Sequence, residues 1–177
     1  ILKKVHDDGA NLYISMDGGM MSEFSDITGF ELVTKSRSTK THTAEFDGAV
    51  FKLDTMYDMI LKAKTAKVLA VNEVGNPVFG VNEYGRGKVY FVSSCIERYA
   101  STTPGFADGE NKEDYYRLYK AMNLKNPQKI ASVNLHTAGI TEHIINDTSR
   151  YILLINYYYS SNWCTSRRNA RTFMQRY

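Results

Sequence analysis

The sequence predicts an α/β fold that carries β-hairpins and is followed by a small all-β domain. Two observations support this prediction. Short apolar runs bounded by Gly, Asn, Asp or Pro recur through the first hundred residues, as buried strands between tight turns do. Segments with helical spacing of apolar residues flank these runs, and alternating helices and strands are typical of α/β folds. The 177 residues, 43% of them hydrophobic, suffice for a sizeable core.

The first elements follow from turn residues on either side of apolar runs. Residues 1–5 resemble the end of an amphipathic helix, so we expect the true N-terminus to lie upstream. A buried strand is predicted over 11–16, because Asp8-Gly9 precedes it and Asp17-Gly18-Gly19 follows it. A short helix is then expected over 20–27, and a solvated polar loop over 35–41. Outer strands are expected over 31–33, 44–46 and 49–53.

The clearest signal is a set of three β-rich runs, 68–71, 78–81 and 89–92. Gly75-Asn76-Pro77 and Tyr84-Gly85-Arg86-Gly87 separate them, and both segments have the composition of tight hairpin turns. The third run is apolar on both faces, which is typical of a strand that is covered on both sides. It is therefore predicted to be a core strand.

The remaining elements divide the chain. An apolar stripe predicts a helix over 112–122, with Asn111 as its N-cap; the stripe consists of Tyr115, Leu118, Tyr119 and Met122. Strands are predicted over 131–136, 140–145 and 151–157. The expected organisation is an α/β domain over 1–124, a small β-domain over 125–160 and a basic tail over 161–177.

Charge is unevenly distributed. Five of the 22 basic residues and none of the 19 acidic ones lie after residue 149, which leaves the preceding part with a net charge of −2. The basic residues of the last segment are Arg150, Arg167, Arg168, Arg171 and Arg176. From Ala170 to Tyr177 the apolar residues keep helical spacing, so the tail is interpreted either as a basic amphipathic helix or as a segment joined across missing residues. Nucleic-acid and membrane binding are not expected of the main body.

Several strings resemble a known family. Val5-His6-Asp7-Asp8-Gly9-Ala10-Asn11-Leu12-Tyr13-Ile14-Ser15, Ile27-Thr28-Gly29-Phe30-Glu31-Leu32 and Tyr84-Gly85-Arg86-Gly87-Lys88-Val89-Tyr90-Phe91 are similar to the middle domain of β-galactosidase-type glycoside hydrolases. That trimerisation domain is itself similar to class I glutamine amidotransferases. The resemblance covers 1–157 and implies a partial flavodoxin/amidotransferase-like sheet that lacks its first strands. It also implies that the catalytic carboxylates lie on an upstream (β/α)8 barrel.

The resemblance therefore implies a non-catalytic C-terminal segment of a glycoside hydrolase. Its partners would be the catalytic barrel, a neighbouring copy in a homo-oligomer, and the carbohydrate substrate at the parent active site. Two alternatives stay open at this point. One is an independent amidotransferase-like domain that binds a small molecule near Cys95 and Glu97, and the other is a basic-tailed interaction module. Sugar specificity and compartment are not predicted, and no cofactor is expected.

Cys95 and Glu97 are the candidate catalytic residues. Cys95 follows a buried strand, where α/β sheets place residues that contact ligands. An amidotransferase nucleophile needs a Gly-x-Cys-x-Gly elbow and a nearby His, but the string here is Val92-Ser93-Ser94-Cys95-Ile96-Glu97. The preferred interpretation of Cys95 is thus a structural thiol, and two cysteines, Cys95 and Cys164, are too few for a disulfide framework.

Other candidate groups have simpler interpretations. Glycoside hydrolysis needs two paired carboxyls, and none of Glu31, Glu45, Glu73, Glu83 and Glu97 lies in a recognisable catalytic string. No metal site is expected, because His6, His42, His136 and His143 lack ligand spacing. Gly85-Arg86-Gly87-Lys88 resembles a phosphate loop but joins two strands, so it is predicted to be a turn. Asp17-Gly18-Gly19 is likewise interpreted as a turn before it is considered as an anion site.

Overall fold

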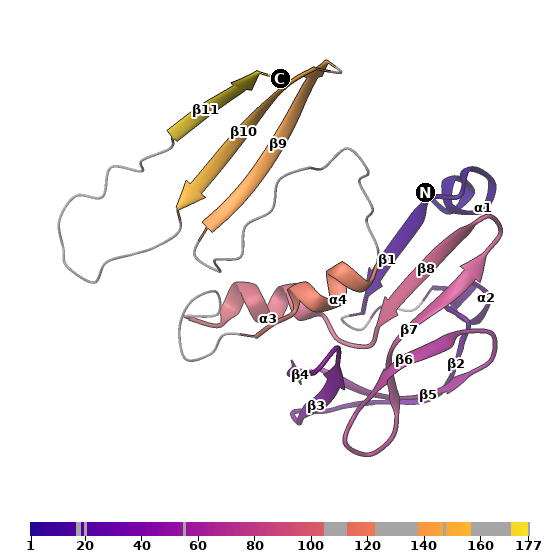
Figure 1. Ribbon diagram of the computed structural model, residues 1–177. Coiled ribbons are helices and arrows are strands. Elements are labelled where there is room, and N and C mark those ends of the chain that lie inside the picture. The colour runs from indigo at the N-terminus through magenta and orange to yellow at the C-terminus, as the bar shows by residue number, and fades with distance from the viewer. Residues whose placement is uncertain are drawn as a thin grey trace. The chain divides into compact units, whose positions relative to one another are not determined.

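The computed structural model describes residues 1–16, 19, 21–54, 56–104, 113–122, 138–146, 148–156 and 171–176. The chain divides into two compact units, the first made of 1–106 and 113–124 and the second of 107–112 and 125–177. Its described part is rich in β-strands, and its helices are short (Figure 1). None of the helices in this part is long and apolar enough to cross a membrane.

The first unit is built on a four-stranded sheet with the strand order β1-β8-β7-β6. Strands β1 and β8 are parallel, and the other neighbours are antiparallel. Two further antiparallel ribbons pair β2 with β5 and β3 with β4. In chain order the elements are α1 (Leu2–Asp8), β1 (Asn11–Ser15), α2 (Phe24–Thr28), β2 (Phe30–Arg37), β3 (Thr41–Phe46), β4 (Ala49–Asp54), β5 (Tyr57–Ala63), β6 (Lys67–Val71), β7 (Pro77–Tyr84), β8 (Gly87–Val92), α3 (Ile96–Thr102) and α4 (Tyr116–Ala121).

Strand β8 is the core strand, as its sequence predicts. It lies between β1 and β7, and four of its last five residues are buried. Successive side chains of a strand point to opposite faces, so β8 supplies both sides of the sheet. Tyr90 and Val92 pack with the β3–β4 hairpin and α4, whereas Phe91 packs with α2 and the β2–β5 ribbon. The sheet is therefore covered on both faces.

The apolar stripe of the last helix in this unit is confirmed. Tyr115, Leu118 and Met122 are each about 3% exposed, and Tyr119 packs beside them. The Tyr115 hydroxyl donates a hydrogen bond to the Lys52 carbonyl, and the Lys52 amide donates to Glu113 Oε2 at 3.1 Å. These contacts attach α4 to β4. The helix begins only at Tyr116, with Tyr115 as its N-cap, so the predicted start at 112 and the predicted N-cap Asn111 were wrong.

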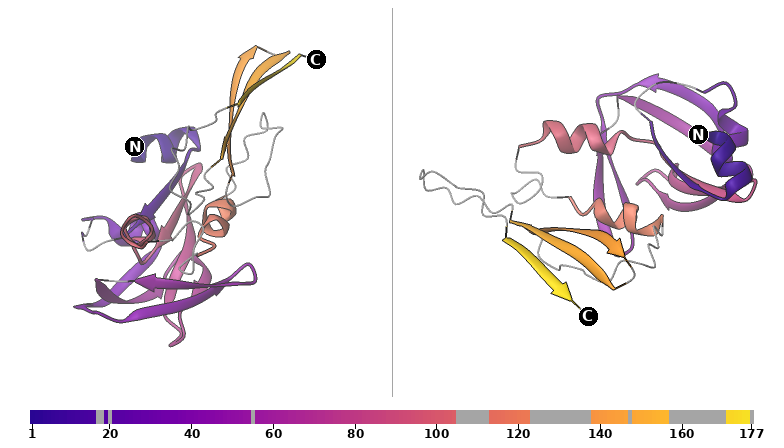
Figure 2. Two further views of the ribbon diagram at one scale, coloured as in Figure 1. Left: turned by 90° about the vertical axis from the view of Figure 1, so that its left-hand side faces the viewer. Right: turned by 90° about the horizontal axis from the view of Figure 1, so that it is seen from above.

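The second unit contains a three-stranded antiparallel sheet with the order β11-β10-β9 (Figure 2). Its strands are β9 (Ala138–Asn146), β10 (Ser149–Asn156) and β11 (Arg171–Arg176). The predicted strands 140–145 and 151–157 correspond to β9 and β10, while the predicted strand 131–136 lies outside the described residues. The boundary at 124/125 stays a prediction.

Of the predicted α/β class, the structure confirms only that the described part of the chain is rich in β-strands and has short helices. A flavodoxin-like sheet is built from parallel strands joined by helical crossovers. In the four-stranded sheet only the β1–β8 pair is parallel, and β6, β7 and β8 follow one another as antiparallel hairpins. The amidotransferase-like interpretation is therefore not confirmed by the described strands.

Three local predictions were wrong. The predicted loop over 35–41 is loop only at 38–40: residues 35–37 belong to β2, which pairs with β5 as far as Arg37, and Thr41 begins β3. Strand β5 was missed, although Met59 and Leu61 alternate with exposed neighbours in the period-2 pattern of a strand. Helix α3 was missed because its seven residues bury only Ile96, too little for a recognisable stripe.

The interpretation of the tail as a helix was also wrong for residues 171–176, the part of the tail that the structure describes. Residues 171–176 form β11, which pairs with β10 from Ser149↔Arg176 to Leu154↔Arg171. Tertiary pairing with β10 overrides the helical spacing of the apolar residues, since propensity and spacing are weak signals over six residues. Trp163, Cys164, Arg167 and Arg168 lie outside the described residues.

Candidate functional site

The two residues singled out as catalytic candidates lie just beyond the end of the core strand. Cys95 is the N-cap residue of α3, and its side chain is half-buried and makes no capping hydrogen bond. Glu97 is exposed and lies in the first turn of the same helix. The parallel strands β1 and β8 both end here, so Ser15 and Tyr13 of β1 approach this end of the sheet. The location is the one that the sequence predicts.

Glu97 is held by a tyrosine from another helix. The Tyr119 hydroxyl of α4 donates a hydrogen bond to Glu97 Oε1 at 2.6 Å. The ring of Tyr119 in turn meets the ring of Tyr13 edge to face, with centroids 5.6 Å apart. This cluster, Tyr13, Glu97 and Tyr119, therefore joins β1, α3 and α4.

The protonation states follow from burial and from these contacts. Burial of Glu97 acts to raise its pKa, but hydrogen bonds from Tyr119 and Ser15 outweigh burial and lower the pKa. Burial, together with the Glu97 carboxylate, raises the pKa of Tyr13 and of Tyr119. At neutral pH the cluster is thus one carboxylate beside two neutral phenols.

This arrangement lacks the base that a cysteine nucleophile needs. A reactive thiol requires a nearby His or another group that favours the thiolate. Among the histidines that the structure describes in the first unit, His6 is bonded to Asp7 and His42 to Asp58 and Glu73. Neither bonds Cys95. The chemistry available at this end of the sheet is that of a structural carboxylate.

Replacing Tyr119 by phenylalanine should lower the free energy of unfolding by about 1 kcal/mol at pH 7, since it removes one charge-assisted hydrogen bond at a partly exposed site. A carboxylate whose pKa is lowered by folding stabilises the protein above its unfolded pKa and loses that contribution as the pH falls through the lowered value. The difference between wild type and Tyr119→Phe should therefore shrink below about pH 4. Urea unfolding at several pH values, followed at NMR signals of the first unit, measures it, and a pH-independent difference would contradict the assignment.

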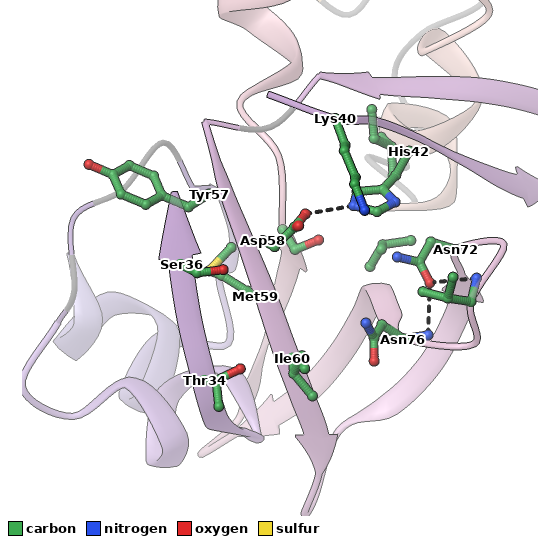
Figure 3. A pocket seen from close by; sticks show the side chains of 14 residues that line it. Thr34, Ser36, Lys40, His42, Tyr57, Asp58, Met59, Ile60, Asn72 and Asn76 are labelled. Atoms are coloured by element: carbon green, nitrogen blue, oxygen red, sulfur yellow. Dashed lines mark hydrogen bonds and ion pairs between the residues drawn. The ribbon is translucent and has the colours of Figure 1, made fainter. Parts of the chain in front are cut away.

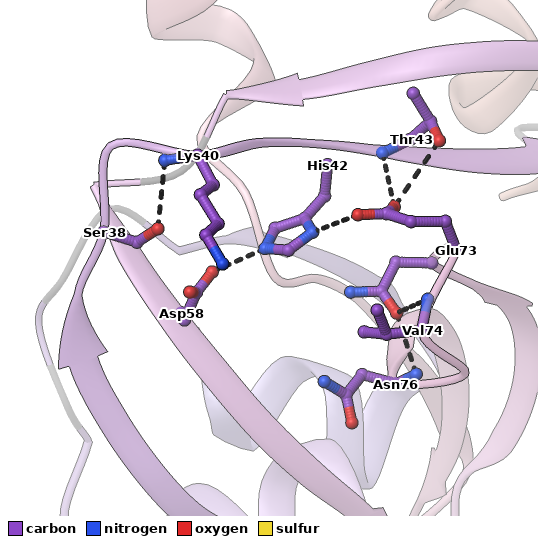
Figure 4. A network of polar contacts seen from close by, with 9 residues as sticks. Ser38, Lys40, His42, Thr43, Asp58, Glu73, Val74 and Asn76 are labelled. Carbon is purple, nitrogen blue, oxygen red and sulfur yellow. Dashed lines mark hydrogen bonds and ion pairs between the residues drawn. The ribbon is translucent and has the colours of Figure 1, made fainter.

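A second polar cluster lies away from this site, and the sequence analysis missed it. His42 of β3 lies at the wall of a cavity that also contacts β2, β5 and the turn after β6 (Figure 3). Its Nε2 lies 2.6 Å from Asp58 Oδ1 of β5, and its Nδ1 lies 2.6 Å from Glu73 Oε1. The Thr43 amide donates to the other oxygen of Glu73 at 2.8 Å (Figure 4). One imidazole thus connects three separate segments of the chain.

This cluster favours a protonated imidazole. Burial of His42 acts to lower its pKa, but the hydrogen bonds to Glu73 and Asp58 and their negative charges outweigh it and raise the pKa. The hydrogen bond with His42, followed by the one from the Thr43 amide, lowers the pKa of Glu73 to about 2. Only 14% of the His42 side chain is exposed. His42, which the sequence shows only to lack metal-ligand spacing, is therefore a largely buried link between two carboxylates.

The stability of the first unit should fall as the pH rises from 6 to 9. A histidine whose pKa is raised by folding contributes fully below its unfolded pKa of about 6.5 and loses that contribution above its folded value. The loss should be about 1 kcal/mol, because both carboxylates are partly solvated. Thermal unfolding of wild type, His42→Gln and the exposed control His6→Gln, followed at NMR signals of the first unit, checks this. His42→Gln should flatten the profile and His6→Gln should not; a wild-type slope retained in His42→Gln would refute the role.

The other candidates are placed as follows. Glu31, Glu45 and Glu83 are exposed on β2, β3 and β7. Among the residues that the structure describes, no group of three or more His, Cys, Asp or Glu side chains could hold a metal ion. His143 is exposed on β9, while His136 and most of the Asp17-Gly18-Gly19 turn lie outside the described residues.

Of the basic residues after position 149, Arg150 is neutralised within its own sheet. Its guanidinium lies 3.1 Å from Glu142 Oε2. The interaction role of the basic tail stays a prediction.

Comparison with known proteins identifies relatives in fold but not in sequence. No family model matches the chain, and no curated protein is a significant match. A β-galactosidase from Bacillus circulans sp. alkalophilus aligns with a TM-score of 0.59 and 16% identity, over 88% of this chain and 24% of that protein. Gan42B, a GH42 β-galactosidase from G. stearothermophilus, aligns at 0.55 and 15%, over 88% and 23%.

A third similar structure has a different enzyme name. The exo-β-1,4-mannosidase Op5Man5 from Opitutaceae bacterium strain TAV5 aligns with a TM-score of 0.56 and 18% identity, over 68% of this chain and 22% of the mannosidase. At such identities the likeness concerns the fold. The chain spans about a quarter of the length of these enzymes and shares its fold with that part of them.

Proposed function

We propose that this chain is a non-catalytic segment of a glycoside hydrolase of the β-galactosidase or β-mannosidase type, which packs against the catalytic barrel or a neighbouring subunit. The observation that supports this most is the shared fold with two β-galactosidases and an exo-mannosidase, confined to about a quarter of each. A fold that recurs as part of enzymes with different names is more consistent with a supporting role than with recognition of one substrate.

The carboxylates support the non-catalytic part of the proposal. A glycosidase needs one carboxyl that stays protonated to act as general acid, which requires a raised pKa. The pKa values of Glu73 and Glu97 are both lowered, and each side chain is bonded to a partner within its own cluster. Both are therefore ionised at neutral pH.

The parallel β1–β8 pair followed by α3 is the part of the fold that supports a trimerisation-like, amidotransferase-related origin. In that interpretation Cys95 stands where a nucleophile would, at the end of β8. Its string has no Gly on either side. The structural thiol is the preferred role, and labelling with a thiol reagent near neutral pH should therefore be slow.

Exposed apolar side chains support the packing role. Val33 of β2 is 56% exposed and Ile60 of β5 is 44% exposed. The two lie close together, because Thr34 pairs with Ile60 at a bulge that contains Val33. Exposed aliphatic residues on a ribbon are typical of a surface that is covered in an assembly. Val33 and Ile60 are the positions where we expect contact with the barrel or a second copy.

The experiment that tests the function is hydrolysis of aryl β-galactosides and β-mannosides by the purified 177-residue chain. We expect no activity above the buffer rate. Hydrolysis that disappears in both Glu73→Gln and Glu97→Gln would overturn the non-catalytic assignment. In the longer protein, should this chain be part of one, Val33→Ser with Ile60→Ser should weaken subunit or domain association, while the exposed control Val50→Ser should not.

A further inference from the structure

The cavity beside His42 lies within the first unit and is partly open to solvent; apart from Ile60 at its edge, its lining is separate from the packing surface proposed above. It has a volume of about 250 Å³ and is bounded by the β2–β5 ribbon on one side and by the β6–β7 turn on the other (Figure 3). Thr34 and Ser36 are two residues apart on β2, and Asp58 and Ile60 are two apart on β5. Each pair therefore presents its side chains on one face of the ribbon.

The opposite wall is formed by two asparagines from the turn. Asn72 is 7% exposed, and its Oδ1 accepts hydrogen bonds from the Asn76 amide at 2.8 Å and the Val74 amide at 3.2 Å. Both acceptor positions of that oxygen are thus used, which fixes the side chain and leaves its Nδ2 as a donor. Figure 3 shows the amides of Asn72 and Asn76 pointing from the turn toward β5. Both lie on the cavity lining.

The charges at this site balance. Asp58 and Glu73 flank His42 (Figure 4), and Lys40 is a further residue of the lining. Two carboxylates therefore face one imidazolium and one ammonium. A phosphate or a strongly cationic ligand would find no net opposite charge here, whereas a neutral polar ligand would meet no repulsion.

The remaining polar groups of the lining can pair with a ligand that carries both hydrogen-bond donors and acceptors. Thr34, Ser36 and Ser93 contribute hydroxyls, each of which can both donate and accept, as can each hydroxyl of a polyol. The apolar part of the lining is suited to the C–H face of a ring and consists of Leu53, Met59, Ile60, Val74 and Val78. The volume lies just below the range of roughly 300–1,000 Å³ that is usual for drug-sized ligands.

We propose that this cavity binds a neutral polyhydroxyl ligand of the size of one sugar ring, held by the amides of Asn72 and Asn76, the Asp58 carboxylate and the β2 hydroxyls. The site lies within the first unit, so the proposal is independent of whether the chain belongs to a glycosidase. Its failure would leave the non-catalytic role untouched.

The test is an NMR titration of the isotope-labelled 177-residue chain with methyl β-D-galactopyranoside. We expect saturable shifts of the Asn72 and Asn76 side-chain amide signals in the millimolar range. Asn76→Ala should weaken binding roughly 3- to 10-fold, the loss of one or two hydrogen bonds. Its backbone amide still bonds Asn72, so the turn is retained. Thr41→Ala, on β3 next to His42 but outside the lining, should bind as wild type does.

Three outcomes would overturn the proposal. One is the absence of saturable shifts up to roughly 100 mM sugar, two orders of magnitude above a millimolar Kd. The second is unchanged affinity in Asn76→Ala, which would place the sugar elsewhere. The third is tighter binding of inorganic phosphate at the same amides, which would make the site an anion site. A folded Asn76→Ala spectrum is confirmed first, and Ser36→Ala replaces this variant if the turn does not survive.

Discussion

Replacing Phe91 by alanine should lower the free energy of unfolding of the first unit by about 3–5 kcal/mol, the usual cost of removing a buried phenylalanine. Phe91 is fully buried in the strand at the centre of the sheet. Its ring lies 5.3 Å from Phe24 of α2, edge to face, and 5.8 Å from Phe30 of β2. Truncation would leave a cavity between three elements that cannot all move inward, because Phe24 and Phe30 are themselves held by packing.

Native-state hydrogen exchange at the amides of β7 and β8 is the suitable measurement. The chain has two compact units, so a single unfolding curve would mix their stabilities. The matched control is Val50→Ala on β4, where the side chain is 66% exposed and the change should stay within about 0.5 kcal/mol. A loss below about 1 kcal/mol for Phe91→Ala would mean that β8 is not the core strand.

The sequence predicts this core strand well, and the reason is physical. Val89-Tyr90-Phe91-Val92 is apolar at every position, and only a strand covered on both faces requires that pattern. The flanking turns are encoded equally locally, by Gly and Pro. The ribbon formed by β2 and β5 is different. Its outer face carries mainly polar side chains, Ile60 apart, so only its partner, 24 residues away in sequence at Lys35↔Met59, decides that it is a strand.

The candidate sites show the same contrast. Cys95 and Glu97 could be found because they follow a recognisable strand, and local sequence is enough to place them at its end. His42, Asp58 and Glu73 lie on three segments whose meeting depends on the pairing of ribbons. No spacing in the sequence records such a contact. The sequence nevertheless held one signal for His42. It lies two residues before Ala44 on β3, so both side chains point to the same face of the strand, and Ala44 is buried.

The Gly-rich turn before β8 is explained by what packs on it. A side chain at Gly87 would place its Cβ 2.1 Å from the Ala10 carbonyl oxygen and 2.5 Å from that of Val5. Both atoms belong to backbone in or just after α1, which cannot yield as a flexible side chain could. The Arg86 amide also donates to the His6 carbonyl at 2.8 Å, at the C-terminal end of α1. The string that resembles a phosphate loop is thus a docking site for a helix.

Gly87→Ala should therefore cost about 3 kcal/mol, at the upper end for an inserted methyl group, and α1 should lose its contact with β8. Hydrogen exchange of the α1 amides should approach the unprotected rate, while β6, on the far edge of the sheet, keeps its protection. The neighbouring exposed residue provides the control, and Lys88→Ala should change neither. If α1 stays protected in Gly87→Ala, the close approach of the helix to this turn does not exist, and the glycine serves the turn alone.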